Sequence, residues 1–134
     1  GKYFRIGEES SLSGASNWPA ETEIIFLCGN TYRVLEYFGP EPFDGNEWYF
    51  NLDESGTITY PATSPTGEPQ MGNGQPFISC ATDPGNMSNV PCGASSTNYA
   101  EFDGDNIKLY MSYGYLTPGS GPREFFHVLE KIVD

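Results

Sequence analysis

The chain consists of short runs of β-branched and aromatic residues separated by turn-forming residues, and this pattern constrains the fold more than any other feature. A half-buried strand alternates apolar and polar residues because successive side chains point to opposite faces. In residues 47–52, for example, Trp48, Phe50 and Leu52 alternate with more polar neighbours. The 3.6-residue period of an amphipathic helix is nearly absent. The sequence therefore predicts an all-β fold.

Eight segments carry the strand pattern. They are 22–28, 31–38, 47–52, 57–60, 76–81, 98–102, 107–115 and 123–133. The last run is apolar on both faces, which fits a central strand or a short helix, and its β-branched and aromatic content favours a strand. Since turns join the runs in sequence, we expect an antiparallel meander of about seven or eight strands. We expect it to close as a barrel, with a β-sandwich as the alternative.

Two tight hairpins are predicted from their connections. Gly29-Asn30 separates the first two runs, and a two-residue Gly-Asn connection is typical of a hairpin. The tetrapeptide at 103–106, Asp-Gly-Asp-Asn, connects the runs 98–102 and 107–115 and predicts the second hairpin. In the second run, Tyr32 and Val34 share one face.

The chain of 134 residues has the length of one domain. Residues 1–21 are polar and poorly patterned, so we expect an N-terminal arm or a linker remnant there. Residues 22–134 are expected to form a single β-barrel domain. Residues 61–75 lack periodicity and are predicted to be a surface loop. No apolar run approaches the roughly 18–20 residues of a transmembrane helix.

The charge balance excludes some partners. Acidic residues number 18 and basic residues 6, which gives a formal net charge of −12. Binding phosphates requires Lys and Arg to displace counterions, so we expect no nucleic-acid partner. Electrostatic adhesion to an anionic membrane surface is excluded for the same reason.

Cysteine usage predicts an oxidising, extracytoplasmic compartment. Cys80 and Cys92 enclose eleven residues rich in Pro, Gly, Asn and Ser, and a disulfide closing such a loop contributes about 3 kcal/mol. Cys28 ends an apolar run and is predicted to be a buried thiol. A zinc site is disfavoured, because three cysteines and the distant His127 lack the paired spacing of zinc ligands.

Four phrases carry a family resemblance. They are Tyr-Phe-Gly-Pro at 37–40, Trp-Tyr-Phe-Asn-Leu at 48–52, Tyr-Met-Ser-Tyr-Gly-Tyr at 110–115 and Phe-His-Val-Leu-Glu-Lys-Ile at 126–132. In these phrases the chain resembles the C-terminal domains of lipid-anchored surface proteins from Bacteroides-type gut bacteria, which accompany glycan-uptake systems. The resemblance implies a lipocalin-like barrel, an outer-membrane or cell-surface location, and surface proteins of an uptake complex as further partners. It carries over no catalytic residue.

Catalytic motifs are weak. His127 is the only histidine and lies in an apolar run, where a packed strand residue is the commoner case. Glycoside hydrolysis needs two carboxyl groups facing one sugar, and Glu36, Glu47 and Glu101 are the candidates in strand runs. With 18 acids, such pairs also arise by chance. We therefore expect no enzyme activity and no cofactor, with a carboxylate-based hydrolase as an alternative.

The turn at 103–106 allows two interpretations. Asp103, Asp105 and Asn106 offer closely spaced oxygen atoms that suit a calcium ion. The further ligands of an EF-hand are missing, and a plain hairpin turn explains the same residues.

The surplus of aromatic residues is the most suggestive functional feature, since Tyr and Trp rings stack on sugars or line pockets. The candidate ligand-binding residues are Trp18, Tyr49, Tyr110, Tyr115 and Arg123. Other apolar residues at period-two spacing are predicted to form the core, namely Trp48, Phe50, Ile58, Leu109, Met111 and Phe126.

Together these features predict a non-catalytic ligand-binding domain of a secreted or lipid-anchored surface protein. A glycan is the preferred ligand. A lipid or another hydrophobic small molecule inside a lipocalin-like barrel is the alternative. Sugar binding requires exposed aromatic rings, whereas lipid binding requires an unfilled apolar cavity.

Overall fold

The computed structural model describes residues 2–10, 21–35, 47–70, 74–79, 98–117 and 121–131. All regular structure in these ranges is β-strand, which confirms the all-β prediction. The nine strands are β1 (Lys2–Ser10), β2 (Glu21–Cys28), β3 (Thr31–Leu35), β4 (Trp48–Leu52), β5 (Ile58–Thr59), β6 (Phe77–Ile78), β7 (Tyr99–Asp103), β8 (Asn106–Thr117) and β9 (Gly121–Lys131). The described residues include no helix long and apolar enough to cross a membrane.

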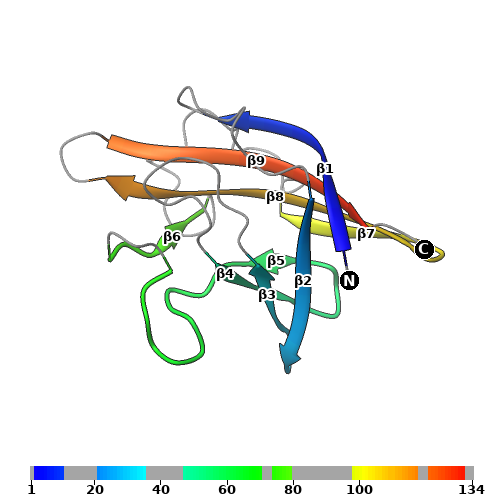
Figure 1. Cartoon of the computed structure of the whole chain (residues 1–134), viewed down its shortest axis with the longest axis horizontal. Coiled ribbons are helices and arrows are strands. Elements are labelled where there is room, and N and C mark those ends of the chain that lie inside the picture. Colours follow the sequence, from blue (N-terminus) through cyan, green and yellow to red (C-terminus); the bar gives the residue numbers. More distant parts are fainter. Residues whose placement is uncertain are drawn as a thin grey trace.

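The strands pair antiparallel in the order β5-β4-β3-β2-β1-β9-β8-β6, and β7 also pairs with β8. Strands adjacent in sequence are neighbours from β1 to β5 and again from β7 to β9, as expected of a meander. Figure 1 shows the long β8 and β9 side by side, with β3, β4 and β5 lying across from them. The sheet is therefore strongly curled.

The prediction of an arm at residues 1–21 is wrong for Lys2–Ser10, which form β1. This strand pairs with β2, where Lys2 lies opposite Glu23, and with β9, where Ser10 lies opposite Phe125. A bulge between Arg5 and Gly7 interrupts the second ladder. Backbone hydrogen bonds on both edges hold this strand in the sheet.

The final run is a strand, β9, and not a helix. It pairs with β8 along its length and with β1 on its other edge. The consecutive residues Val128 and Leu129 are both buried. Burial on both faces explains why this run shows no alternation.

Both predicted hairpins are confirmed. Cys28 lies opposite Thr31 across Gly29-Asn30, and Asp103 lies opposite Asn106. Gly29 has φ +59°, in the left-handed region that suits a two-residue turn.

The hydrophobic core lies on the concave face of the curled sheet. The predicted core residues Trp48, Phe50, Ile58, Leu109 and Met111 are all buried. The side chain of Phe126 lies outside the described residues. The same buried cluster also contains Val34, Phe77, Tyr113 and Tyr115.

The prediction for Cys28 is wrong, because its thiol is exposed. The run continues past the core into the end of the β2–β3 hairpin. There Ile25, Phe26 and Leu27 are 37%, 56% and 39% exposed.

Residues 61–70 contain no strand, consistent with the predicted loop, but one side chain anchors them to β4. Gln70 is buried, its Nε2 donates to the Tyr49 carbonyl at 2.8 Å, and its Oε1 accepts from the Tyr49 N–H at 3.0 Å. A second bond runs from Nε2 to the Pro61 carbonyl at 3.1 Å. The amide thereby takes the place of a neighbouring strand beside β4.

The two ends of the sheet meet at Asn98 and Gly56. Thr57 and Tyr99 form an isolated bridge, the Ile58 N–H donates to the Asn98 carbonyl at 3.0 Å, and the Ala100 N–H donates to the Gly56 carbonyl at 2.8 Å. Gly56 has φ +89°, and a Cβ there would lie 3.2 Å from the Ala100 oxygen, so the close approach requires glycine. Within the described ranges this junction is a single bridge and not a continuous strand ladder.

Candidate functional site

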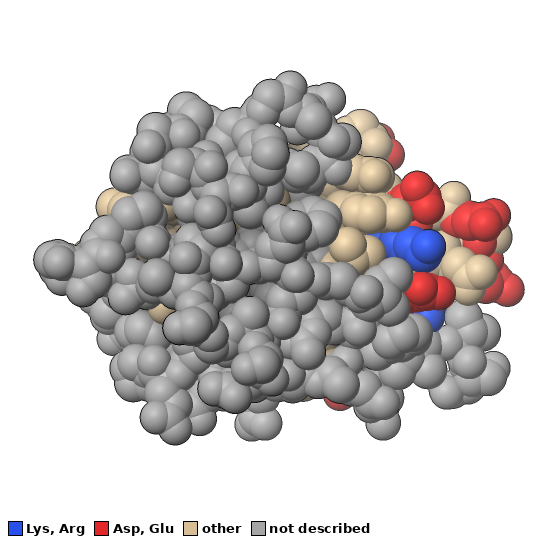
Figure 2. All heavy atoms as spheres, turned by 90° about the horizontal axis from the view of Figure 1, so that it is seen from above, with Lys and Arg blue, Asp and Glu red and all other residues tan. Residues whose placement is uncertain are grey.

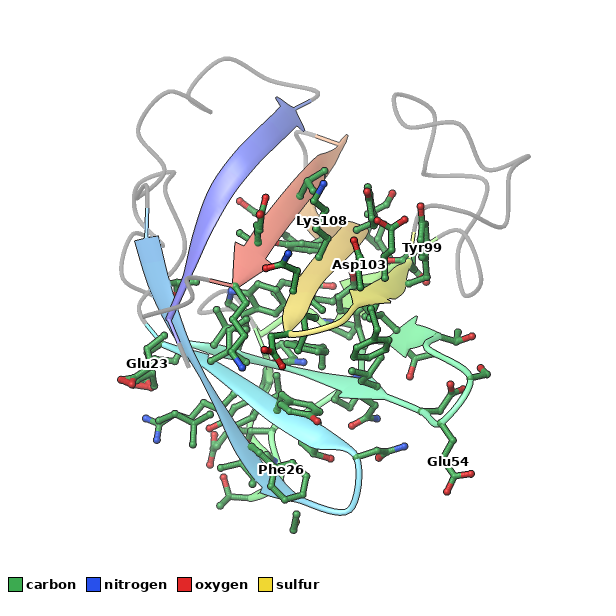
Figure 3. All side chains as sticks on the ribbon, turned by 90° about the vertical axis from the view of Figure 1, so that its right-hand side faces the viewer. Glu23, Phe26, Glu54, Tyr99, Asp103 and Lys108 are labelled. Atoms are coloured by element: carbon green, nitrogen blue, oxygen red, sulfur yellow. The ribbon has the colours of Figure 1, made fainter. Side chains whose placement is uncertain are left out.

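Three turns come together at one end of the curled sheet, and the inward-facing residues next to them are aromatic or aliphatic. The turns connect β2 to β3, β4 to β5 and β7 to β8. Phe26, Glu54 and Asp103 mark the three hairpins in Figure 3. The Leu52 N–H donates to the Asn30 carbonyl at 2.9 Å, which fixes the first turn against the end of β4.

A groove of about 590 Å³ opens between these turns. Its apolar lining is Tyr32, Leu52 and Phe102, and its remaining lining residues are Gly29, Asn30, Asp53 and Glu54. The volume falls within the range of about 300–1,000 Å³ typical of small-molecule sites. Phe102 is 60% exposed, which is unusual for a large apolar side chain at an inward-facing position.

The ring of Tyr32 packs against two other aromatic rings. Phe50 stacks on it with ring centres 5.3 Å apart and an interplanar angle of 12°, and Phe26 meets it edge-on at 5.3 Å. Phe50 is fully buried, whereas Phe26 is more than half exposed. Tyr32, which lines the groove, is thus supported by a buried core ring. A side chain fixed in this way loses little conformational entropy when a ligand binds.

Acidic residues surround this end of the molecule. Asp53 and Glu54 line the groove, and Asp103 and Asp105 occupy the adjacent β7–β8 turn. Among the described residues coloured in Figure 2, Asp and Glu lie next to one another at the right-hand end, with Lys or Arg between them. The lining residues include no Lys or Arg within the described part of the chain.

Asp53 organises the β4–β5 turn. Its Oδ1 accepts bonds from the Ser55 hydroxyl at 2.6 Å, the Ser55 N–H at 2.9 Å and the Thr57 N–H at 3.0 Å. These bonds, chiefly that of the Ser55 hydroxyl, lower the pKa of Asp53 below its ordinary value of 3.8. The carboxylate therefore stays ionised and turn-bound at neutral pH.

A lowered pKa makes this turn acid-sensitive. Because the folded state favours the ionised form, Asp53 stabilises the fold above the ordinary pKa, and the contribution is lost as the pH falls through the lower folded value. We expect Asp53→Ala to reduce the urea midpoint at pH 7, with a difference from wild type that shrinks below about pH 4. Glu54→Ala, in the same turn, is the matched control. A difference that persists unchanged at pH 2 would contradict the assignment.

The predicted ligand-binding residues do not form one site. Tyr49 lies half-buried on β4, and Tyr110 lies half-buried on β8, stacked on Tyr99 with ring centres 4.6 Å apart. Tyr115 is only 2% exposed, so its selection as an exposed ring is wrong, because it lies on the core-facing side of β8. Arg123 lies in β9 opposite Tyr115, but its side chain is not among the described residues.

Several other candidates fall outside the described ranges, namely Trp18, Glu36, Cys80 and Cys92. His127 lies in β9 opposite Met111, and its side chain is also not described. The disulfide therefore stays a prediction.

The remaining candidates are the two carboxylates of Glu47 and Glu101 and the calcium candidates of the β7–β8 turn. Glu47 forms an ion pair with Arg33, and Glu101 lies opposite Lys108. Asp103 and Asn106 flank a two-residue hairpin turn, which accounts for their spacing. Among the described residues, no group of three His, Cys, Asp or Glu side chains is arranged to hold a metal ion.

The sequence did not identify the groove residues as functional. Tyr32, Leu52 and Phe102 each lie next to or near a turn on the inward-facing side of a strand. Alternation assigns such positions to the core. Their proximity to short turns is the one signal that would have distinguished them, since a side chain at the end of a curled sheet is not covered by a further layer.

Comparison with known proteins finds no matching family model, no matching curated protein and no matching solved structure.

Proposed function

We propose that this chain is a non-catalytic carbohydrate-binding domain and that the groove between the three turns is its binding site. The combination of aromatic rings and hydrogen-bonding groups in one open groove carries the proposal. A sugar ring places its C–H face against Tyr32 and Phe102. Its hydroxyl groups donate to the carboxylates of Asp53 and Glu54 or bond to the amide of Asn30.

The packed interior favours this proposal over a hydrophobic ligand held inside a barrel. The ring of Trp48 lies 5.0 Å from that of Tyr113 and 5.6 Å from that of Phe77, and all three residues are buried. Phe50 and Tyr60 add further ring contacts to Trp48. Protein side chains thus occupy the space in which a lipocalin-like barrel would hold its ligand.

The state of Asp53 favours binding over hydrolysis. A glycosidase needs a carboxylic acid whose pKa is raised so that it can protonate the leaving group. The pKa of Asp53 is lowered, and its Oδ1 already accepts three hydrogen bonds. We therefore assign this carboxylate to turn structure and ligand contact.

The proposal includes a barrel-like architecture and an extracytoplasmic location. The bridge between Thr57 and Tyr99, which joins the two ends of the sheet, supports the first. The second rests on the predicted Cys80–Cys92 disulfide and on the resemblance to surface lipoproteins.

A glycan-array screen of the wild-type chain and two variants tests the proposed site. Phe102→Ala is expected to weaken binding by a factor of about 2 to 10, since a stacked aromatic ring contributes about 0.5–1.5 kcal/mol. Because Phe102 is 60% exposed, its removal should leave the fold intact. Tyr110→Ala removes a half-buried ring from the outer face of β8 and is expected to leave the affinity unchanged.

Two outcomes would contradict the proposal. Wild-type chain that binds no glycan would exclude carbohydrate binding. Binding that is lost in Tyr110→Ala but retained in Phe102→Ala would move the site to the outer face, where Tyr99 and Tyr110 stack.

A further inference from the structure

The charge around the groove is one-sided. Asp53 and Glu54 line the groove. Asp103 directly follows the groove residue Phe102 at the end of β7, and Asp105 lies in the β7–β8 turn. None of the groove-lining residues that the structure describes carries a positive charge. A concave surface with charges of one sign attracts ligands of the opposite sign and repels ligands of the same sign.

The described cations near this region face acids elsewhere. Lys108 lies on β8 between Glu101 of β7 and Glu130 of β9 in the strand register. Arg33 forms an ion pair with Glu47. Lys108 and Arg33 therefore lie next to acids outside the groove lining.

We propose that the preferred ligand is a cationic glycan, in which amino sugars carry free ammonium groups. This inference rests on the proposed carbohydrate-binding function and specifies the class of sugar. The sugar ring covers Tyr32 or Phe102, and its ammonium group lies near the carboxylates of Asp53 and Glu54.

Two properties of the groove support an amino sugar over a neutral or acidic one. An ammonium group gains from the negative faces of aromatic rings as well as from carboxylates, and the groove offers both. Hydrogen bonds within the turn, chiefly that of the Ser55 hydroxyl, also lower the pKa of Asp53 below its ordinary value, so its carboxylate is charged at the slightly acidic pH that keeps amines protonated. An acidic glycan would instead meet like charges on two sides of the groove.

A basic peptide is the competing cationic ligand. It shares the ammonium group but lacks a sugar ring that can stack on Phe102 and contact Tyr32, whose ring packs against Phe26 and Phe50. The groove of about 590 Å³ has room for a sugar ring together with parts of its neighbours. We therefore favour the glycan, and the experiment includes the peptide.

The test compares two oligosaccharides with the same sugar backbone, one with free amino groups and one in which each amine is acetylated and uncharged, and the salt dependence separates the effect of charge from that of the acetyl groups. Isothermal titration calorimetry of the whole chain would use a pentamer of β-1,4-linked glucosamine and the corresponding pentamer of N-acetylglucosamine, at a slightly acidic pH that keeps the amines protonated. We expect the glucosamine pentamer to bind at least tenfold tighter in low salt. The difference should shrink at high ionic strength, because exposed charges are screened.

A matched pair of variants locates the effect. Glu54→Gln keeps the shape of the groove and removes one charge, and it is expected to reduce the preference for the amine form about threefold or more. Glu101→Gln removes an equal charge from the outer face of β7 and is expected to change the preference little. An equal loss in both variants would indicate a general effect of net charge and overturn the assignment to the groove.

The remaining outcomes separate the two proposals. Equal affinity for both pentamers would overturn the preference for cationic sugars while supporting carbohydrate binding. Binding of pentalysine without binding of either sugar would overturn both and identify a site for basic peptides. If neither sugar binds and the glycan array is blank, carbohydrate binding itself is excluded.

Discussion

Replacing Asn98 with alanine is expected to lower the free energy of unfolding by about 2–4 kcal/mol, because several groups in the interior would lose their hydrogen-bond partners. The Asn98 side chain occupies a gap in the sheet. On β8, β7 pairs as far as Tyr110 and β6 pairs at Gly114 and Tyr115, which leaves Ser112 between them. Without another partner, the backbone of Ser112 would be unpaired on that edge.

The amide of Asn98 satisfies this backbone in both directions. Its Oδ1 accepts from the Ser112 N–H at 2.9 Å, and its Nδ2 donates to the Ser112 carbonyl at 2.9 Å. The Tyr60 hydroxyl also donates to Oδ1 at 2.6 Å. Burial raises the pKa of Tyr60 well above 10, so this hydroxyl keeps its proton and remains a donor. Alanine removes all three bonds.

Urea denaturation followed by tryptophan fluorescence would measure the loss. Asn106→Ala is the matched control, because Asn106 is exposed at the β7–β8 turn, and such a surface change is expected to cost less than about 0.5 kcal/mol. A loss below about 1 kcal/mol for Asn98→Ala would show that water or a shifted strand replaces the hydrogen bonds of the amide. The Asn98 side chain would then not be needed to hold the two ends of the sheet together.

Asn98 and Gln70 also show where sequence reasoning reaches its limit. Hairpins depend on local residues, so Gly29-Asn30 predicted the β2–β3 turn correctly. The amides of Asn98 and Gln70 bond to backbone 14 and 21 residues away, and no local pattern identifies such partners. In the sequence, Asn98 is the first residue of a predicted strand and Gln70 is one polar residue in a predicted loop.

The edges and ends of the sheet were predicted less well than its centre. Burial of Trp48 and Leu109 follows from alternation, because neighbouring strands cover these positions. The same alternation assigns Phe102 to the core, although no further layer covers it at the end of the sheet. Strand β1 was missed because its pairing with β2 and β9 joins segments that are far apart in the sequence, which no local pattern identifies. The groove therefore became visible only once the turns were placed in space.

Replacing Trp48 with alanine is expected to cost about 3–5 kcal/mol of unfolding free energy, because it leaves a cavity in the middle of the aromatic core. Trp48 is fully buried, and four other rings have their centres within 5.0–6.4 Å of its own. Tyr49→Ala, at the next position and on the opposite face of β4, is the control and is expected to cost clearly less. Thermal unfolding followed by circular dichroism at matched concentrations would measure both. Equal losses would contradict the placement of Trp48 at the centre of the core.

The same variant distinguishes a packed interior from a ligand cavity. An apolar cavity of the size that Trp48→Ala creates stays dry and binds small aromatic molecules. We therefore expect benzene to raise the melting temperature of Trp48→Ala and to leave that of the wild-type chain unchanged, since a ligand stabilises only a state that binds it. Benzene that stabilised both chains equally would mean that the wild-type interior already contains free space. That result would favour a hydrophobic ligand inside the sheet over a sugar in the groove at its end.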